Sequence, residues 1–339
     1  MNKSVGIAIV FFCGAVAVGS TADLQRYSGI CEPSGGAFIG ASTFAVATDE
    51  SNVIRIYERG SPAISASVDL TTFTGYEKSD LEGATARGDI VYWTASQSNS
   101  SGGRDKKRKV IFATRIVQGN DSTTLEPTGV VREDLKSQLV KLSGSSDGSI
   151  NVEGLAATPD GGLLFGFRNL VDDKAAVVKL KNADLVLAAK GNQAEFGNTA
   201  MLDLDGRGIR SLERVGDRYL IVAGKASDAA AVDYALYWWD GEPEHKAVAW
   251  ETQPNLSGLD PEVAMVLQDG RALQIISDDG DRCAEVEEED PPSDQRGFSS
   301  IDVPSKRQRE ITNSDHGDQR LRCWWRRGGC EAQPPSTVN

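Results

Sequence analysis

The stretch Asn151-Val-Glu-Gly-Leu-Ala-Ala-Thr-Pro-Asp160-Gly-Gly-Leu-Leu-Phe-Gly-Phe167 places an acidic residue in a short apolar strand, followed by a Pro-Asp-Gly turn and a second apolar strand. The same phrase occurs at residues 80–93, and looser copies occur at 206–222 and 259–276. A unit that recurs roughly every fifty to seventy residues predicts a propeller or another array of repeats.

Each copy has the pattern of a β-hairpin, with apolar strands on both sides of a turn made of Gly, Asp or Pro. A third apolar run usually follows, and a fourth often completes the group. The third runs are residues 53–57, 109–116, 175–180 and 234–239, and the fourth runs are 63–69, 200–203 and 246–250. Four short antiparallel strands per repeat, with few candidate helices, are typical of the blades of a β-propeller.

The number of blades follows from the second strand of each hairpin. These strands lie near residues 44, 90, 163, 219 and 272, so we predict an all-β fold, a β-propeller with five four-stranded antiparallel blades. The long interval between residues 94 and 163 leaves six blades as the alternative. Residues 131–142 of that interval have the pattern of a short helix, which favours five.

Both ends of the chain differ from this repeated body. Residues 1–22 combine a lysine near the start, an apolar run and small residues ending at Ala22, which is the pattern of a Sec signal peptide. The apolar run, 5–18, is short for a membrane span. We therefore predict a signal peptide at 1–22, a propeller domain at 23–303 and a mobile tail containing Cys, Trp and Arg at 304–339, in a periplasmic or secreted protein.

Export places the cysteines in an oxidising compartment, where disulfides form. Apart from Cys13 in the predicted signal peptide, the chain has Cys31, Cys283, Cys323 and Cys330. Four cysteines allow three connectivities. Because a propeller closes by bringing its first and last blades together, we predict that Cys31 pairs with Cys283 and Cys323 with Cys330. A thiolate metal site is the alternative, but no pair has the CxxC spacing.

The formal net charge of −13 argues against nucleic acid or an anionic membrane as a partner. The acidic run at 285–290 is expected to be a solvated loop. The basic cluster at 104–109 is expected to be the tip of a hairpin, with contact to a phosphate or an acidic polymer as the alternative. We expect a monomer without a membrane span.

The two histidines argue against several enzyme classes. His245 lies in a Gly-Glu-Pro-Glu turn and His316 lies in the tail, so neither is placed for a Ser-His-Asp or Cys-His arrangement. The sequence also lacks a G-x-S-x-G elbow, a phosphate-binding loop and a G-x-G-x-x-G motif before a helix. Histidine-dependent hydrolysis and nucleotide binding are therefore disfavoured.

Charged residues recur at equivalent positions of the repeat and converge on the channel of a propeller. We predict Glu82, Glu153, Glu262 and Asp278 as metal ligands, because hard oxygen ligands suit Ca²⁺ or Mg²⁺. Arginines among such residues suit a phosphate or carboxylate ligand. The predicted ligand-binding residues are Asp49, Glu50, Arg168, Asn169, Arg207 and Arg210. The alternative is that glutamates and arginines of neighbouring blades form internal salt bridges.

Five motifs occur in one order along the chain. They are Asp49-Glu-Ser-Asn-Val-Ile-Arg55, Asp80-Leu-Glu-Gly83, Asn151-Val-Glu-Gly-Leu-Ala156, Gly166-Phe-Arg-Asn169 and Gly206-Arg-Gly-Ile-Arg210. Together, over roughly residues 35–303, they resemble the bacterial propeller family catalogued as domain of unknown function 3616. That resemblance implies a propeller and no specific activity. More distantly, residues 153–161 are similar to a phrase of phytase-like esterase propellers, which implies a cation-assisted phosphoesterase.

Three functions are consistent with these residues. The first is an exported propeller that binds a cation or a small anionic ligand at the mouth of its central channel. The alternative is a divalent-cation-dependent phosphoesterase, in which Arg168 and Arg210 neutralise the charge of the transition state. The further alternative is a scaffold for protein interactions. We rank binding first, because the sequence contains no identifiable group for proton transfer.

Overall fold

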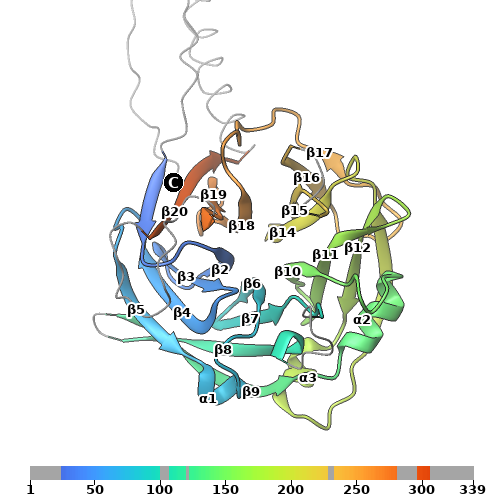
Figure 1. Cartoon of the computed structure of the whole chain (residues 1–339), viewed down its shortest axis with the longest axis horizontal. Helices are drawn as coiled ribbons and strands as arrows, with labels where there is room; N and C mark the ends of the chain where they lie inside the picture. Colours follow the sequence, from blue (N-terminus) through green and yellow to red (C-terminus); the bar gives the residue numbers. More distant parts are fainter. Residues whose placement is uncertain (1–23, 100–106, 120–121, 228–232, 281–295, 306–339) are drawn as a thin grey trace, which may run out of the picture.

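The structure, a computed structural model, describes residues 24–99, 107–119, 122–227, 233–280 and 296–305. These residues form five four-stranded antiparallel sheets, arranged as blades round a central axis (Figure 1). The chain is therefore a five-bladed β-propeller. The predicted all-β fold class and the favoured count of five blades are confirmed.

Each blade runs from an innermost strand at the channel to an outermost strand. Blade 1 consists of β2 (Pro33–Phe38), β3 (Thr43–Thr48), β4 (Ser51–Glu58) and β5 (Ile64–Asp69). Blade 2 consists of β6 (Leu81–Arg87), β7 (Ile90–Ala95), β8 (Ile111–Gln118) and β9 (Thr123–Arg132). Blade 3 consists of β10 (Val152–Ala157), β11 (Leu163–Val171), β12 (Lys174–Leu180) and β13 (Phe196–Leu202). Blade 4 consists of β14 (Gly208–Val215), β15 (Arg218–Gly224), β16 (Ala235–Trp239) and β17 (Val248–Ala249).

Blade 5 joins the two ends of the propeller. It consists of β18 (Pro261–Val266), β19 (Ala272–Ser277), β20 (Gly297–Pro304) and, as its outermost strand, β1 (Gln25–Ser28). Strand β1 pairs antiparallel with β20, and the two lie side by side in Figure 1. The ring is therefore closed by hydrogen bonds between the first and last strands of the described chain.

Four aromatic rings reinforce this closure. Tyr27 of β1 packs against Phe44 and Phe298, each with ring centroids 5.2 Å apart. Tyr57 packs against Phe44 at 5.5 Å and against Phe298 at 5.4 Å, and its hydroxyl donates to the carbonyl of Ser28 at 3.0 Å. Each such pair contributes about 0.5–1.5 kcal/mol beyond its buried area, so the cluster holds blade 1 against blade 5.

The hydrophobic core is divided among the interfaces between blades. Each of five clusters of buried residues draws its members from two neighbouring blades. Between blades 2 and 3, for example, Ile111 packs in one cluster with Leu155 and Phe165. Burial of apolar side chains therefore stabilises each interface, and polar side chains are left to line the channel.

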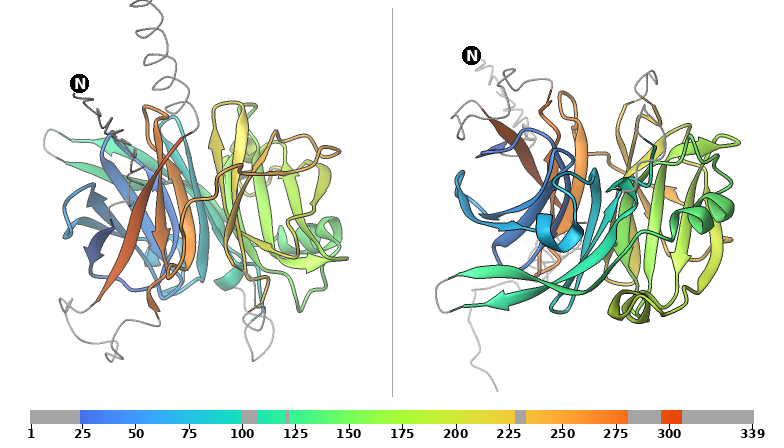
Figure 2. Two further views of the ribbon diagram at one scale, coloured as in Figure 1. Left: turned by 90° about the horizontal axis from the view of Figure 1, so that it is seen from above. Right: turned by 60° about the horizontal axis from the view of Figure 1, so that its bottom comes forward.

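The long interval between the second strands of blades 2 and 3 holds no sixth blade in its described residues. The long hairpin of β8 and β9 and the helix α2 (Lys136–Ser143) occupy this part of the chain (Figure 2). The helix expected at 131–142 begins later, because Arg132 still pairs with Ile111 across the hairpin. It ends where Gly144 adopts a left-handed conformation with φ of 75°. The remaining helices of the described residues are α1 (Thr71–Thr74), η1 (Lys107–Lys109) and α3 (Ala183–Ala188).

Several predictions concern residues outside the described ranges. The signal peptide at 1–22, the acidic run at 285–290, Cys283, and Cys323 and Cys330 of the tail belong to this group. They stay predictions, and so does each disulfide, because the predicted partner of Cys31 is Cys283. Strand β20 reaches Pro304, one residue beyond the predicted end of the propeller. Among the helices that the structure describes, none has the length and apolar character needed to cross a membrane.

Candidate functional site

Every innermost strand has an irregularity at the same place, near its start. The pairing register shifts between the residues that flank Ser34, Glu82, Glu153, Arg210 and Glu262. A β-bulge leaves one residue out of the ladder and changes the direction of its side chain. Four of the five bulged residues, all except Arg210, line the narrow centre of the channel, whose free volume is only about 10 Å³.

Glycine follows the bulged residue in three of the blades, at Gly35, Gly83 and Gly154. A Cβ atom added to Gly83 would lie 2.9 Å from Cβ of Leu155, and one added to Gly154 would lie 3.0 Å from Cβ of Leu212. Only glycine allows so close an approach of neighbouring innermost strands. The repeated Glu-Gly therefore combines a channel carboxylate with tight packing between blades.

Arg210 stands where blades 2, 3 and 5 have glutamate, and it lies between two of those glutamates. Its Nε is 3.0 Å from Oε2 of Glu153 and 3.1 Å from Oε2 of Glu262, and its Nη2 also contacts Glu262. The side chains of Arg210, Glu153 and Glu262 are only 8%, 3% and 7% exposed. This part of the ring is therefore a buried network of ion pairs, as the salt-bridge alternative predicts.

Further groups hold Glu153 in place. Arg168 Nη1 lies 3.3 Å from Oε1 of Glu153, and Asn151 Nδ2 donates to the same oxygen at 2.8 Å. The side-chain oxygen of Asn169 accepts from the backbone N–H of Asn151 at 2.9 Å. Burial raises the pKa of Glu153, while Arg210 and Arg168 act against that shift. Two predicted ligand-binding residues, Arg168 and Asn169, thus contribute to the same network.

The other side of the mouth is acidic, and Glu32, Asp49 and Glu50 meet there. One ligand oxygen from each lies within 4.8 Å of the others. Oδ1 of Asp49 is buried and accepts no hydrogen bond from any residue that the structure describes. Burial, followed by the charges of Glu50 and Glu32, raises the pKa of Asp49 to about 7. Lys78 pairs with Glu50 at 2.7 Å, and both of these side chains are partly exposed.

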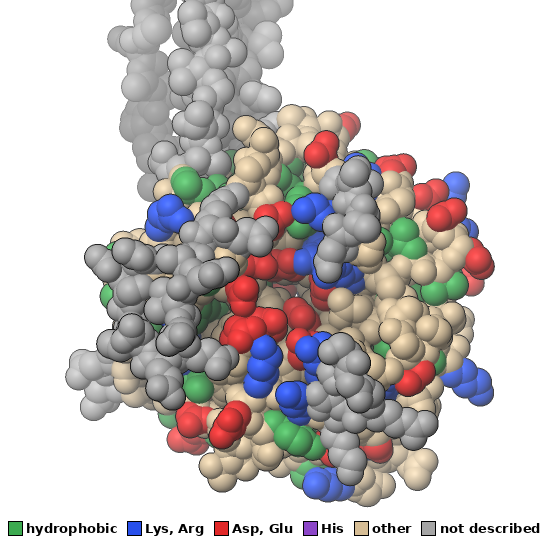
Figure 3. Space-filling view, in the orientation of Figure 1, with side chains coloured by type: hydrophobic (Ala, Val, Ile, Leu, Met, Phe, Trp, Pro, Cys, Tyr) green, Lys and Arg blue, Asp and Glu red, His purple; other side chains and the backbone are tan. Residues whose placement is uncertain are grey.

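Glu82 extends the acidic side towards the centre of the channel. It makes no ion pair with any residue that the structure describes. Burial, followed by the charges of Glu153, Asp80 and Asp49, raises the pKa of Glu82 well above its usual value. Figure 3 shows acidic side chains gathered round the centre of this face, with Lys and Arg beside them.

Asp278 belongs to the same side. A Cβ atom added to Gly280 would lie 2.6 Å from Oε1 of Glu32 and 3.1 Å from Oδ1 of Asp278, so these two carboxylates flank Gly280. Burial raises the pKa of Asp278. Arg207, in contrast, contacts only nearby parts of the chain among the described residues. Its Nε donates to the carbonyl of Asp233 in the same blade at 2.6 Å, and its Nη1 donates to the carbonyl of Leu204 before β14 at 3.4 Å.

The predicted residues therefore fall into two groups, which we call the paired side and the acidic side of the mouth. The paired side comprises Glu153, Glu262, Arg210, Arg168 and Asn169, and the acidic side comprises Asp49, Glu50, Glu82 and Asp278, with Glu32 added. Carboxylates that crowd one another, as those of the acidic side do, suit a hard cation. A phosphate on the paired side would have to displace carboxylates from the arginines.

Sequence reasoning missed Glu32 and Asn151. Glu32 lies just before β2, in the blade that has Ser34 in place of the repeated glutamate, so no repeat position indicated it. Asn151 lies two residues before Glu153, and in an extended strand that spacing puts two side chains on one face. That signal was present in the sequence.

Comparison with known proteins gives the family. The model of the family described as "Protein of unknown function (DUF3616)" matches residues 66–271 of the 339-residue chain. This range lies within residues 35–303, over which the resemblance was expected. A search of curated proteins finds no match to the chain. The more distant resemblance to phytase-like esterases stays a prediction.

Solved structures similar to this chain include three enzymes. A putative oxidoreductase (glucose dehydrogenase) from Thermus thermophilus is 13% identical over 84% of this chain and 100% of that one, with a TM-score of 0.45. Glutaminyl cyclase of Myxococcus xanthus is 12% identical over 83% and 96%, with a TM-score of 0.43. Virginiamycin B lyase of Staphylococcus aureus is 11% identical over 75% and 67%, with a TM-score of 0.36. At these identities and scores, the likeness carries no argument about function.

Proposed function

The chain belongs to the family described as "Protein of unknown function (DUF3616)", and we propose that it is an exported binding propeller that holds a divalent cation on the acidic side of its channel mouth. One observation carries the proposal: Glu32, Asp49 and Glu50 converge within 4.8 Å, and Oδ1 of Asp49 is buried there with no hydrogen-bond donor among the described residues. Burial of a carboxylate is costly without a countercharge. A bound cation supplies that countercharge.

Ca²⁺ suits this group better than Mg²⁺. The carboxylates come from two segments, with Glu32 before β2 and Asp49 and Glu50 directly after β3. Ca²⁺ accepts six to eight oxygens in irregular geometry, whereas Mg²⁺ requires a nearly ideal octahedron. Water and Glu82 or Asp278 would complete the coordination of Ca²⁺.

The arrangement of the arginines favours a cation over an anion, and binding over phosphoester hydrolysis. The phosphoesterase alternative needs Arg168 and Arg210 to neutralise a transferred phosphoryl group. In the structure Arg210 lies between Glu153 and Glu262, and Arg168 contacts Glu153. These arginines therefore already neutralise carboxylates of the protein.

Thermal unfolding of the mature protein tests the proposal. The protein is first treated with a chelator and then titrated with Ca²⁺ or Mg²⁺. A ligand at a hundred times its Kd stabilises the native state by about 2.7 kcal/mol, so we expect a clear rise in Tm that is larger with Ca²⁺ at equal concentration. The variant Asp49→Asn keeps the shape of the side chain and removes its charge, and it should lose most of this rise.

Asp205→Asn is the matched control, because it makes the same substitution at an exposed aspartate of the Arg207 loop. It should respond to Ca²⁺ as the wild type does. Absence of any Ca²⁺-dependent rise in the wild type, or an equal rise in Asp49→Asn, would rule out the cation site. The scaffold alternative would then become the leading hypothesis.

Export is tested separately from binding. The predicted signal peptide ends at Ala22, so the exported protein should begin at Asp23. Mass spectrometry of the protein from the periplasm or the medium measures this directly. A protein that keeps residues 1–22 and stays inside the cell would contradict the export prediction and leave the cation proposal to its own test.

A further inference from the structure

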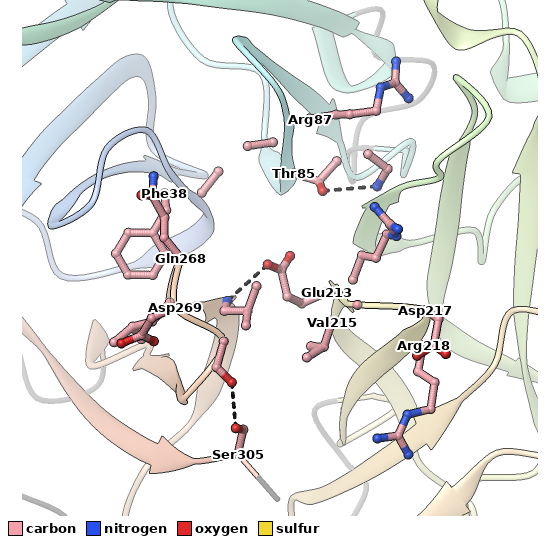
Figure 4. Close-up of a pocket in the computed structure, with 18 of the residues that line it drawn as sticks. Phe38, Thr85, Arg87, Glu213, Val215, Asp217, Arg218, Gln268, Asp269 and Ser305 are labelled. Atoms are coloured by element: carbon pink, nitrogen blue, oxygen red, sulfur yellow. Dashed lines mark hydrogen bonds between the residues drawn. The ribbon is translucent and has the colours of Figure 1, made fainter. Parts of the chain in front are cut away.

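The channel has a second opening at the other end of the innermost strands. There it widens into a cavity of about 900 Å³, while the centre of the channel between the two openings has only about 10 Å³. The cavity is lined by the last residues of the innermost strands and by the turns after β14 and β18 (Figure 4). Its size is typical of a site for a small organic molecule.

Glu213 of β14 occupies a central place in this cavity. Figure 4 shows its carboxylate pointing into the open space, with Oε1 accepting a hydrogen bond from the backbone N–H of Val266 at 3.1 Å. Its described hydrogen bonds come only from backbone N–H groups, those of Val266 and Arg214. Burial, partly opposed by these N–H groups, raises the pKa of Glu213 to about 7.

The hydrogen bond from Val266 to Glu213 links blade 5 to blade 4, and blade 2 shows that such a link does not require a glutamate. Thr85 of β6 lies as far after the bulge at Glu82 as Glu213 lies after the bulge at Arg210. Oγ1 of Thr85 accepts from the backbone N–H of Ala157 in the next blade at 3.1 Å, which is the same link. A short hydroxyl is therefore sufficient to accept the N–H of the next blade. The longer, ionisable side chain of Glu213 is available to contact a ligand as well.

Two of the other charged residues of the lining are paired with residues outside it. Arg87 pairs with Asp184 outside the lining, and Asp269 lies 3.8 Å from Arg271. Four lining charges remain, two of each sign: Glu213, Asp217, Arg214 and Arg218. The guanidinium of Arg218 lies over the ring of Trp238 at 4.6 Å. Arg214 makes no side-chain hydrogen bond or ion pair with the described part of the chain.

This balance indicates the charge of the ligand. A purely cationic molecule would satisfy Glu213 and leave Arg214 unpaired, and a purely anionic one would do the reverse. An ammonium group donates charge-assisted hydrogen bonds to a carboxylate, and a guanidinium matches a carboxylate with two parallel bonds. A molecule with both groups satisfies both side chains and adds no net charge to the cavity.

We propose that this cavity binds a small zwitterion of the free amino acid class, with its protonated amine on Glu213 and its anionic group on Arg214. The site lies at the end of the channel opposite to the acidic side of the mouth. It does not depend on the proposed cation site, because no residue is shared between the two.

Calorimetric titration of the mature protein with individual L-amino acids tests the proposal. Three further probes separate the contributions: ethylamine has only the amine, acetate has only the anion, and glycine betaine keeps both charges but has no N–H group. We expect saturable binding of at least one amino acid and weaker or no binding of all three probes. Glu213→Gln retains an acceptor for Val266 N–H, and it should weaken the amino acid by at least about tenfold.

Arg214→Gln gives a second variant in case Glu213→Gln does not fold, and it should weaken the same amino acid to a similar extent. Asp205→Asn, at an exposed aspartate outside the lining of the cavity, is the control and should bind the amino acid like the wild type. The proposal is overturned if no amino acid binds, if Glu213→Gln and Arg214→Gln bind as tightly as the wild type, or if acetate or ethylamine alone binds equally well.

Discussion

The two sides of the charged mouth differ although the same repeat builds both. On the paired side, Arg210 stands at a bulge position and neutralises Glu153 and Glu262 from the neighbouring blades. On the acidic side, Asp49 and Glu82 are crowded by other carboxylates, and the pKa of each is raised. One arginine in place of a repeated glutamate therefore divides the ring into a neutralised half and a half in which carboxylates crowd one another.

The largest effect on the stability of the protein is expected from removal of Arg210. Arg210→Met leaves Glu153 and Glu262 buried without their shared cation. Breaking a buried ion pair by removing one partner costs about 3–5 kcal/mol, so the free energy of unfolding in urea should fall by that amount. Ca²⁺ should restore part of the loss, because Glu82, Glu153 and Glu262 would then face one another without Arg210 between them. A loss below about 1 kcal/mol would show that the pairs of Arg210 resemble exposed ones.

A change in pH is expected to have an intermediate effect on the stability of the protein. An unfolded aspartate has a pKa near 3.9, whereas folded Asp49 has a pKa of about 7, so the folded protein binds more protons between these values. Its stability should therefore decrease as the pH rises from about 4 through about 7. Unfolding in urea at a series of pH values measures this slope.

Two variants locate the source of the slope. Glu213, at the opposite opening, also has a pKa raised to about 7, so its charge acts in the same direction. Asp49→Asn and Glu213→Gln should each reduce the slope, and saturating Ca²⁺ should remove only the share that Asp49 contributes. An unchanged slope in Asp49→Asn would show that its carboxyl is already ionised in the folded state at low pH.

The smallest effect on stability is expected from the exposed ion pair beside the acidic side of the mouth. Lys78 pairs with Glu50 at 2.7 Å, and the two side chains are 35% and 44% exposed. Such a pair contributes at most about 1 kcal/mol, so Lys78→Met should change stability very little. It removes a positive charge beside the acidic side, so Ca²⁺ should bind somewhat more tightly. Calorimetric titration with Ca²⁺ measures the change, and weaker binding would contradict the placement of the cation beside Glu50.

The repeat in the sequence was sufficient for the fold. Second strands expected near residues 44, 90, 163, 219 and 272 correspond to β3, β7, β11, β15 and β19. The pattern succeeds because strand alternation and turn residues are local properties, repeated in each blade. The helix expected at 131–142 was placed too early, because pairing of β9 with β8 extends the strand to Arg132.

The sequence also predicted that Glu82, Glu153, Glu262 and Arg210 converge on the channel of the propeller. It did not show that Arg210 would pair with Glu153 and Glu262 and leave Glu82 without an ion pair among the described residues. Those partners come from different blades, and their distances depend on bulges and on the close packing at Gly83 and Gly154.

Glu32 and Glu213 also could not be identified as site residues from the sequence. Neither belongs to the repeated phrase as a charged position, so periodicity along the chain carries no information about them. Glu32 meets Asp49 because β2 and β3 pair with Pro33 opposite Thr48, and Glu213 reaches a cavity because five strands end together. Local patterning determines where strands begin and end, whereas the charges that meet at a channel depend on long-range packing, which places residues of separate blades within a few ångströms.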